Sequence, residues 1–323
     1  MSDVETIVTP KMSETQIPPP VPLGTLIKEF ELVELSNHID ISNVGIAHAE
    51  VNRPGLQLAG FYKHFERTRV QVMGQSEYAY LRELSENERD TIFSTYFKTK
   101  PPCLIISRGL IPTEDMLIHA EIHQVPIYSS PWVTSELIGE IIRTLKIKLA
   151  PRVTLHGVLI DIYGEGVVIM GESGVGKSET ALELVKRGHR LVADDAVEVS
   201  KIANNTLVGT CPKLIQYFIE LRGIGIIDVR QMFGVEAVKT NQVIDIVLVL
   251  EHWDEKKQYD RLGLSEEYRE ILGNNVVAHT IPIRPGRNLA IICEAAAVNH
   301  RQKKMGYSAA KELAERLKNV VKE

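Results

Sequence analysis

The sequence has few cysteines, no long apolar run and no strong charge of one sign. Its three cysteines, Cys103, Cys211 and Cys293, lie far apart, so neither a disulfide framework nor a zinc site is indicated. Lysine and arginine number 37 and aspartate and glutamate 42, so the net charge is −5. This balance gives no electrostatic reason to expect nucleic acid or an anionic membrane as a partner.

Targeting and membrane signals are also missing. The apolar run VIDIVLVL, which starts at Val243, is shorter than the ~18–20 residues of a membrane helix and contains Asp245. The N-terminus has no basic region followed by an apolar one, so no signal peptide is predicted. With 44% hydrophobic and 24% charged residues, the composition is typical of soluble globular proteins, and a cytoplasmic location is expected.

The 323 residues are enough for two domains. Residues 1–24 carry five of the fifteen prolines and little apolar periodicity, which predicts a disordered proline-rich tail. Residues 25–149 predict a small α/β domain. Pro151 stops the helix that ends the first domain, so a domain boundary is expected at this point. Residues 150–323 are assigned to a second domain, which contains a phosphate-binding motif.

Apolar periodicity predicts the main elements of both domains. In the first domain the strands are 103–107 and 125–130, and the helices are 113–123, capped by Thr113, and 134–149. In the second domain the pattern predicts a hairpin through YGEG at 163–166, a strand ending in two aspartates at 194–195, a buried strand at 243–251, and helices starting at Asn288 and Ser308.

A glycine-rich motif follows an apolar strand and precedes a helical pattern that ends at Gly188. It fits G-x-x-x-x-G-K-[ST] at every fixed position and consists of Gly171, Glu172, Ser173, Gly174, Val175, Gly176, Lys177 and Ser178. The glycines let backbone N–H groups point at phosphate oxygens, and the helix dipole adds to this attraction. Lys177 is expected on the β- and γ-phosphates and the Ser178 hydroxyl on Mg²⁺. The motif therefore predicts a P-loop.

A P-loop alone does not choose between GTPases, ATPases and small-molecule kinases. A kinase also needs a carboxylate that takes a hydroxyl proton and cations that offset charge. Asp194 and Asp195 end the strand after the P-loop helix, at the edge of an open α/β sheet where ligands bind. One is expected to act on metal or water and the other as a base. Alternatively, Asp194 and Asp195 form a solvated acidic turn or a helix cap without a catalytic role.

Other polar residues are ambiguous when taken alone. His156 lies in an apolar strand, where a structural histidine is the usual outcome. Arg261 follows the buried strand by ten residues and is either a surface arginine or a phosphate clamp. Glu220 and Arg222 border a Gly-x-Gly that brings backbone close to a neighbour. The loop 282–287 carries two arginines into a helix, which outlines an anion site or a basic loop paired with local carboxylates.

Several segments, in this order and spacing, resemble one family. GESGVGKSE, ADDAVEV, ELRGIGIIDV, YDRLGL and IPIRPGRNLAIICEAAAVNHRQKKMGY resemble the bifunctional HPr kinase/phosphorylase family of low-GC Gram-positive bacteria. GLQLAGFYKHFERTRVQVMG, residues 55–74, resembles the first domain of that family. The resemblance spans residues 25–323 and leaves the proline-rich tail unassigned.

The resemblance implies a reaction and its partners. ATP or pyrophosphate would phosphorylate a seryl residue of the phosphocarrier protein HPr, and inorganic phosphate would remove that group to give pyrophosphate. The cofactor implied is Mg²⁺, with Mn²⁺ as a substitute. The family is homohexameric, acts in carbon catabolite repression and responds to fructose bisphosphate and phosphate. Its C-terminal domain resembles the nucleotide-binding core of phosphoenolpyruvate carboxykinase.

The resemblance also implies residue roles. Asp195 matches the general base, His156 an active-site histidine beside it, Lys177 the P-loop lysine, and Arg261 the arginine on the transferred phosphate. Ser178 and Glu220 match the metal site. A loop needed in both directions matches Ile219, Glu220, Leu221, Arg222, Gly223, Ile224, Gly225, Ile226, Ile227 and Asp228. A loop needed for dephosphorylation matches Pro282, Ile283, Arg284, Pro285, Gly286 and Arg287.

Two rival functions use the same phosphate cradle. A P-loop kinase of a small metabolite has no need of the first α/β domain. A non-catalytic nucleotide sensor leaves the two adjacent aspartates, Asp194 and Asp195, without a task.

Overall fold

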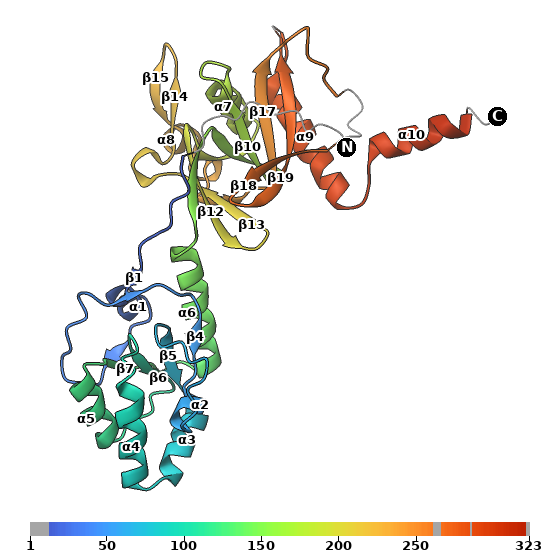
Figure 1. The fold of residues 1–323 in the computed structure, drawn as a ribbon. Coiled ribbons are helices and arrows are strands. Elements are labelled where there is room, and N and C mark those ends of the chain that lie inside the picture. Colours follow the sequence, from blue (N-terminus) through green and yellow to red (C-terminus); the bar gives the residue numbers. More distant parts are fainter. Residues whose placement is uncertain (1–12, 261–265, 285, 321–323) are drawn as a thin grey trace. The chain divides into compact units, whose positions relative to one another are not determined.

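The computed structural model describes residues 13–260, 266–284 and 286–320. The chain divides into two compact units, one spanning Ile17–Ala150 and the other running from Pro151 and including residues 13–16 (Figure 1). The two-domain α/β architecture predicted from the sequence is confirmed. Among the helices described, none has the length and apolar character needed to cross a bilayer.

The N-terminal unit is built on a five-stranded sheet with helices on both faces. Across the sheet the strands are β2 (Val33–Glu34), β7 (Ile127–Ser129), β6 (Leu104–Ile106), β5 (Val70–Met73) and β4 (Val51–Asn52). All neighbours are parallel except β2, which runs antiparallel to β7. A separate short pair joins β1 (Val21–Pro22) to β3 (Gly45–Ile46).

Side chains of this sheet alternate between two cores, as the period of two along a strand requires. Ile105 packs against one set of helices and Ile106 against the other. One face holds α1 (Leu23–Glu29) and α6 (Thr134–Lys148). The opposite core is supplied by α3 (Gln75–Glu83), α4 (Glu86–Phe97) and α5 (Glu114–His123), with Leu58 of α2 (Gly55–Leu58). The predicted strands and helices of this domain are therefore present within one or two residues.

The predicted disordered tail is wrong for its last part. Leu23 is fully buried, and Val21 is 5% exposed. Gln16 exchanges backbone hydrogen bonds with Arg152 at 2.8 and 2.9 Å. The tail is ordered here because its apolar residues Val21 and Leu23 pack into the core of the N-terminal unit. An extended proline-rich stretch can also form backbone hydrogen bonds at the edge of a sheet. Residues 1–12 of the predicted tail lie outside the described residues. Thr113 stands at the N-cap position of α5 as predicted, but its side chain makes no capping hydrogen bond.

The second unit has a six-stranded sheet and a four-stranded sheet packed face to face. The larger sheet runs β11 (Arg190–Ala193), β9 (Val158–Ile162), β10 (Glu165–Gly171), β17 (Ile246–His252), β19 (Asn274–Ile283) and β18 (Glu267–Ile271). The smaller one runs β16 (Asn241–Val243), β13 (Thr206–Thr210), β12 (Ala196–Ala203) and β8 (Arg152–His156), and is wholly antiparallel. Apolar residues of both sheets form one core.

Helices cover the other face of the larger sheet. A second core joins that face to α7 (Lys177–Lys186) and α9 (Leu289–Lys304). Beside them lie a hairpin, β14 (Phe218–Leu221) with β15 (Gly225–Asp228), and the short α8 (Val229–Phe233). Two single 3₁₀ turns span Lys213–Ile215 and Val235–Ala237. The last helix, α10 (Ala309–Val320), follows α9 (Figure 1).

Strand direction determines where the loops of the large sheet gather. β10, β17 and β19 are mutually parallel, and β11 shares their direction because both β10 and β11 run antiparallel to β9. The carboxyl ends of these four strands therefore lie at one edge. That edge carries the P-loop after β10, residues 194–195 after β11, residues 253–260 after β17 and residues 284 and 286–288 after β19.

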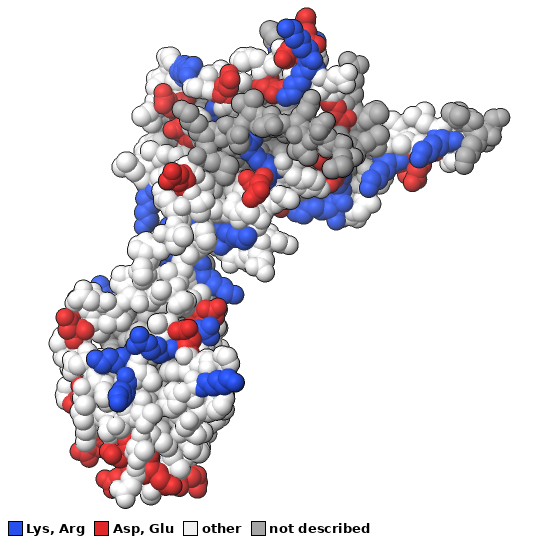
Figure 2. Space-filling model, viewed as in Figure 1, with Lys and Arg blue, Asp and Glu red and all other residues white. Residues whose placement is uncertain are grey.

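Charged side chains of both signs are scattered over both units on the face shown in Figure 2. Acidic side chains gather at the end of the N-terminal unit where α3 connects to α4. The exposed acidic residues of that region are Glu83, Glu86, Glu88 and Asp90. Elsewhere on this face the described basic and acidic side chains are interspersed.

Candidate active site

The P-loop bridges β10 and α7 in a conformation that requires glycine. Gly174 has φ +86° and Gly176 φ +96°, in the left-handed region that most residues avoid. A Cβ at Gly174 would also lie 2.7 Å from Nη1 of Arg222. The Lys177 side chain is folded back across the loop, where its Nζ donates to the carbonyl oxygens of Gly171 at 2.9 Å and Glu172 at 3.0 Å. A phosphate group would compete with these carbonyls for the ammonium, whose pKa is lowered by burial.

Ser178 and Asp194 form the next layer of the site. The Ser178 hydroxyl donates to the Asp194 carboxylate, with Oγ 2.9 Å from Oδ1 and 3.1 Å from Oδ2. The backbone N–H of Glu220 donates to the same carboxylate at 3.3 Å. Asp194 is only 4% exposed, and burial raises its pKa although both hydrogen bonds oppose the rise. The chain thus keeps a nearly enclosed carboxylate directly beneath the phosphate cradle.

These oxygens fit a hard divalent cation. The Ser178 hydroxyl and the carboxylates of Asp194 and Glu220 line the same pocket as the P-loop. Mg²⁺ prefers hydroxyl, carboxylate and water oxygens, and Mn²⁺ accepts the same set. Asp194 thus lines the same pocket as Ser178 and Glu220, the two metal-site residues expected from the family resemblance.

His156 and Asp195 meet because the chain crosses between the two sheets twice at neighbouring points. It passes from β8 to β9 at Gly157 and from β11 to β12 at residues 194–195. The Gly157 N–H donates to the Asp195 carbonyl at 3.1 Å, so the two crossings are joined directly. His156 Nδ1 lies 3.1 Å from Asp195 Oδ1, with side chains 44% and 70% exposed. The histidine is therefore beside the aspartate, not buried in the apolar strand core.

The hairpin β14–β15 borders the pocket from the other side. Ile219 and Leu221 anchor it in the core, whereas Ile224 and Ile226 at its far end are 76% and 73% exposed. Arg222 reaches the P-loop, where its Nη2 donates to Ser173 Oγ at 2.8 Å. The hairpin therefore contacts the phosphate cradle through Arg222 of its turn, and it presents exposed apolar side chains at the same end.

Two further groups of predicted residues do not line the P-loop pocket or are not described. The loop after β19 is held by an Arg287 guanidinium that donates to the Pro282 carbonyl at 2.6 Å, and by the Arg284 guanidinium stacked on Trp253. It lies at the same sheet edge as the P-loop, but its residues are not among those that line the P-loop pocket. Arg261 and Pro285 lie outside the described residues.

The structure brings most of the predicted P-loop, catalytic and metal-site residues around one pocket, together with Arg222 of the predicted loop 219–228. Its lining consists of His156, Ser173, Gly174, Gly176, Lys177, Ser178, Glu179, Asp194, Asp195, Glu220 and Arg222. Val175, by contrast, packs into the core. Sequence reasoning did not single out Glu179. It gave Asp194 no definite role, although the adjacent pair of aspartates was the available signal. Trp253 carried no signal that a single sequence could reveal.

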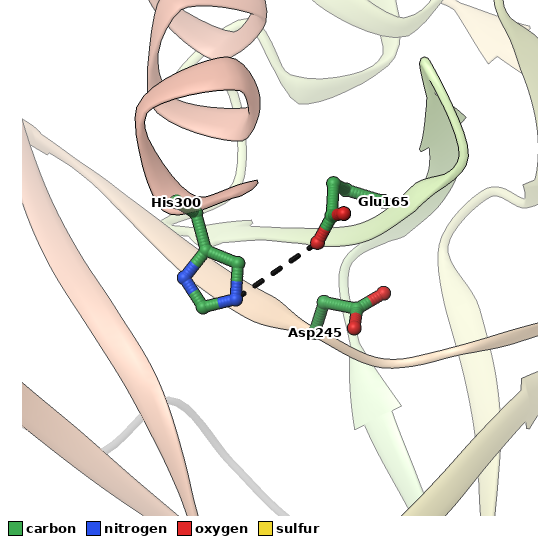
Figure 3. A group of neighbouring side chains, drawn as sticks. All are labelled: Glu165, Asp245 and His300. Carbon is green, nitrogen blue, oxygen red and sulfur yellow. Dashed lines mark ion pairs between the residues drawn. The ribbon is translucent and has the colours of Figure 1, made fainter. Parts of the chain in front are cut away.

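A second cluster lies at the opposite ends of the strands. Glu165 begins β10, Asp245 directly precedes β17, and His300 comes from α9 (Figure 3). His300 Nε2 is 3.9 Å from the Glu165 carboxylate. Lys304 Nζ lies 2.8 Å from the Asp245 carboxylate and 3.3 Å from that of Glu165, which Arg301 also pairs at 3.2 Å. Basic side chains already neutralise these acids, and the cluster ties the end of α9 to the sheet.

Comparison with known proteins identifies the family. The family profile described as HPr Serine kinase N terminus matches residues 21–145, and that described as HPr Serine kinase C-terminal domain matches residues 147–317. The HPr kinase/phosphorylase of Lachnoclostridium phytofermentans is 54% identical over 299 residues, which cover 93% of this chain and 97% of the relative. That of Bacillus subtilis is 44% identical over 298 residues, which cover 92% and 96%.

A solved structure, the Hpr(Ser) kinase/phosphatase from Coxiella burnetii, is 38% identical and covers 50% of this chain and 97% of its own, with a TM-score of 0.45. The two family profiles together match most of the chain, the relatives align over almost its whole length, and the P-loop lies within the matched C-terminal domain. The chain belongs to the HPr serine kinase family, whose members named above are HPr kinase/phosphorylases.

Proposed function

We propose that this chain phosphorylates a seryl residue of the phosphocarrier protein HPr with ATP or pyrophosphate, and that the same site removes the group by phosphorolysis. The single observation that carries the proposal is the pocket in which the P-loop faces the His156–Asp195 pair. The P-loop would then hold the donor phosphates close to the Asp195 carboxylate, which would act as the base on the seryl hydroxyl. The family of the chain supplies the identity of the acceptor.

In the forward direction the P-loop backbone and Lys177 hold the donor phosphates. The seryl hydroxyl attacks the terminal phosphorus in line, and Asp195 accepts its proton. His156, 3.1 Å from that carboxylate, orients it. Arg222 keeps the loop in place through Ser173. Arg261 is proposed on the moving phosphoryl group, as the family resemblance implies.

In reverse, an oxygen of inorganic phosphate attacks the phosphorus of the phosphoseryl group. The new P–O bond gives pyrophosphate, the P–Oγ bond breaks, and protonated Asp195 returns its proton to the seryl oxygen. Microscopic reversibility lets one set of residues serve both directions, so the direction depends on which phosphate compounds fill the site.

Ser178, Asp194 and Glu220 are the residues proposed to hold Mg²⁺. When bound there, the cation supplies charge neutralisation for the donor phosphates. The enclosed Asp194 carboxylate accepts the hydrogen bond of the Ser178 hydroxyl and so holds that oxygen in the pocket.

Finer properties come from the family resemblance. We include in the proposal a homohexamer, activation of the kinase direction by fructose bisphosphate and of the phosphorylase direction by phosphate, and a cytoplasmic location. The small-metabolite kinase and the nucleotide sensor are not favoured, because the relatives that cover almost the whole chain are named HPr kinase/phosphorylases.

The test is intact mass spectrometry of HPr incubated with the protein, ATP and Mg²⁺. After desalting, inorganic phosphate alone is added. We expect one phosphate mass to be gained in the first step and lost in the second, with pyrophosphate released. A gain without a loss would leave a one-way kinase, and no gain with ATP still bound would reject the proposal in favour of a sensor or a small substrate.

A further inference from the structure

Residues 13–16 lie along the outer edge of the four-stranded sheet. β8 is the last strand of that sheet, and Gln16 forms an antiparallel bridge with Arg152 at its start. Further along, the Ser13 N–H donates to the Thr154 carbonyl at 3.2 Å, and the Thr154 N–H donates to Ser13 Oγ at 2.9 Å. The N-terminal segment is therefore anchored on the unit that carries the P-loop.

The direction of this pairing leads to the active site. Because the two segments are antiparallel, the chain followed from Ser13 toward its N-terminus runs along β8 toward His156. At an antiparallel edge only every second residue turns its backbone N–H and C=O outward. Arg152 and Thr154 are two such residues, and His156 is the next. The outer edge of β8 thus ends at the histidine that pairs with Asp195.

The chain before Ser13 is long enough to enter the pocket. Asp195 directly precedes β12, the neighbour of β8 on its other side. The rise of three residues along β8 and two strand spacings across it separate Ser13 from Asp195, which is about 14 Å between backbone positions. Four extended residues also span about 14 Å, so Thr9 is the first hydroxyl residue before Ser13 with that reach. Pro10 favours an extended Thr9, because the residue before a proline avoids the helical region.

The pocket is open to an acceptor on this side. The side chains of His156 and Asp195 are 44% and 70% exposed, and both line the pocket that contains the P-loop. The two family profiles begin at residues 21 and 147, so the N-terminal segment lies outside the matched part of the chain. A short tether gives a hydroxyl an effective concentration in the millimolar range, which favours its reaction over that of a dilute acceptor.

We propose that Thr9 is an intramolecular acceptor, so that the chain phosphorylates its own N-terminal segment when no HPr occupies the site. Thr9 Oγ1 attacks the γ-phosphorus of ATP, the bond from that phosphorus to the β-phosphate oxygen breaks, ADP leaves, and Asp195 takes the hydroxyl proton. In reverse, inorganic phosphate attacks the phosphothreonyl group, pyrophosphate leaves, and Asp195 returns the proton to Oγ1. The inference rests on the proposed function, because it gives the same site a second acceptor.

The test is intact mass spectrometry of the full chain incubated with ATP and Mg²⁺ but without HPr. We expect one phosphate mass to be gained per chain, to be located on Thr9 by fragmentation, and to be lost when inorganic phosphate is added after desalting. Thr9→Val removes the hydroxyl at nearly constant volume and should abolish the gain. Thr6→Val, the same substitution in the same segment, is the matched control and should still gain the phosphate.

A second variant tests the anchor on β8. Ser13→Pro removes both the N–H and the hydroxyl that pair with Thr154. The rate of self-phosphorylation should fall about tenfold, as expected when two hydrogen bonds of modest net strength are lost. The rate on HPr should change much less, because that acceptor does not depend on the anchor.

A mixture of two variants tests whether the transfer is intramolecular. Asp195→Asn chains keep the acceptor and lack the base, whereas Thr9→Val chains keep the base and lack the acceptor. Phosphate gained in the mixture would show transfer between chains and would overturn the inference. No mass gain by a wild-type chain that phosphorylates HPr, or a gain retained by Thr9→Val, would also overturn it. A wild-type chain that fails on HPr would instead refute the proposed function.

Discussion

The sharpest prediction concerns Asp195→Asn, which removes the proposed base without disturbing the fold. Asp195 has φ +67°, a left-handed conformation that asparagine adopts as readily as aspartate. Its side chain is 70% exposed, so little packing is lost. Asp195→Ala is the poorer probe, because alanine in this conformation costs about 1–2 kcal/mol of strain.

The magnitude follows from the proton transfer that is removed. A positioned general base contributes about 10²–10⁴-fold, which corresponds to roughly 3–5.5 kcal/mol of transition-state stabilisation. We expect the kcat of Asp195→Asn to fall by about this factor in both directions, because the same group returns the proton in phosphorolysis. The KM for ATP should change little, since Lys177 and the P-loop backbone hold the donor.

The assay is single-turnover phosphorylation of HPr and release of pyrophosphate from seryl-phosphorylated HPr, with thermal unfolding as the control. The melting temperature of the variant should match that of wild type within about 2 °C. A kinase rate above about one tenth of wild type would refute the assignment of the base. A loss confined to one direction would refute the idea that a single carboxyl serves both.

Three further variants test neighbouring parts of the site. Burial raises the pKa of Asp194 in the folded state, so the ionised carboxylate destabilises the protein above that pKa. Asp194→Asn should therefore raise the melting temperature by about 2 °C at pH 8. Calorimetry at lower pH should show a smaller difference between the two melting temperatures, because acid protonates the wild-type carboxylate. The same variant should weaken Mg²⁺-dependent ATP binding measured by calorimetry. Gly174→Ala adds left-handed strain and displaces Arg222 from Ser173, so the KM for ATP should rise about tenfold, whereas an unchanged KM would contradict the close approach. His156→Ala removes the partner of the Asp195 carboxylate and should lower kcat about tenfold or more with an unchanged melting temperature. A purely structural histidine would lower the melting temperature instead.

Local sequence patterns predicted much of the fold because they reflect local physics. The hairpin through Tyr163 and Gly164, the P-loop and the helix after Asn288 each have a short-range cause, such as a turn residue, a glycine or a cap. Asn288, for example, accepts a hydrogen bond from the Ile291 N–H at 3.2 Å. The pairing of strands far apart in the sequence could not be read in this way. The four-stranded sheet and the crossings at Gly157 and at residues 194–195 depend on such pairing.

The site shows the same division. The P-loop residues follow one another, so their spacing alone predicted the cradle. His156 and Asp195 are separated by the P-loop itself, and only β8–β12 pairing brings them together. Likewise, the stack of Arg284 on Trp253 arises from the register of β17 against β19, which a single sequence does not reveal.

The exposure of Asp195 has a consequence for fidelity. A base open to solvent has water beside it, and water is a competing nucleophile for any donor in the P-loop. The crossings that carry His156 and Asp195 bring no covering loop of their own over that carboxylate. A docked protein acceptor would displace the water as it presents its hydroxyl, so the substrate itself would act as the lid, and futile hydrolysis of ATP would be suppressed only while the right partner is in place.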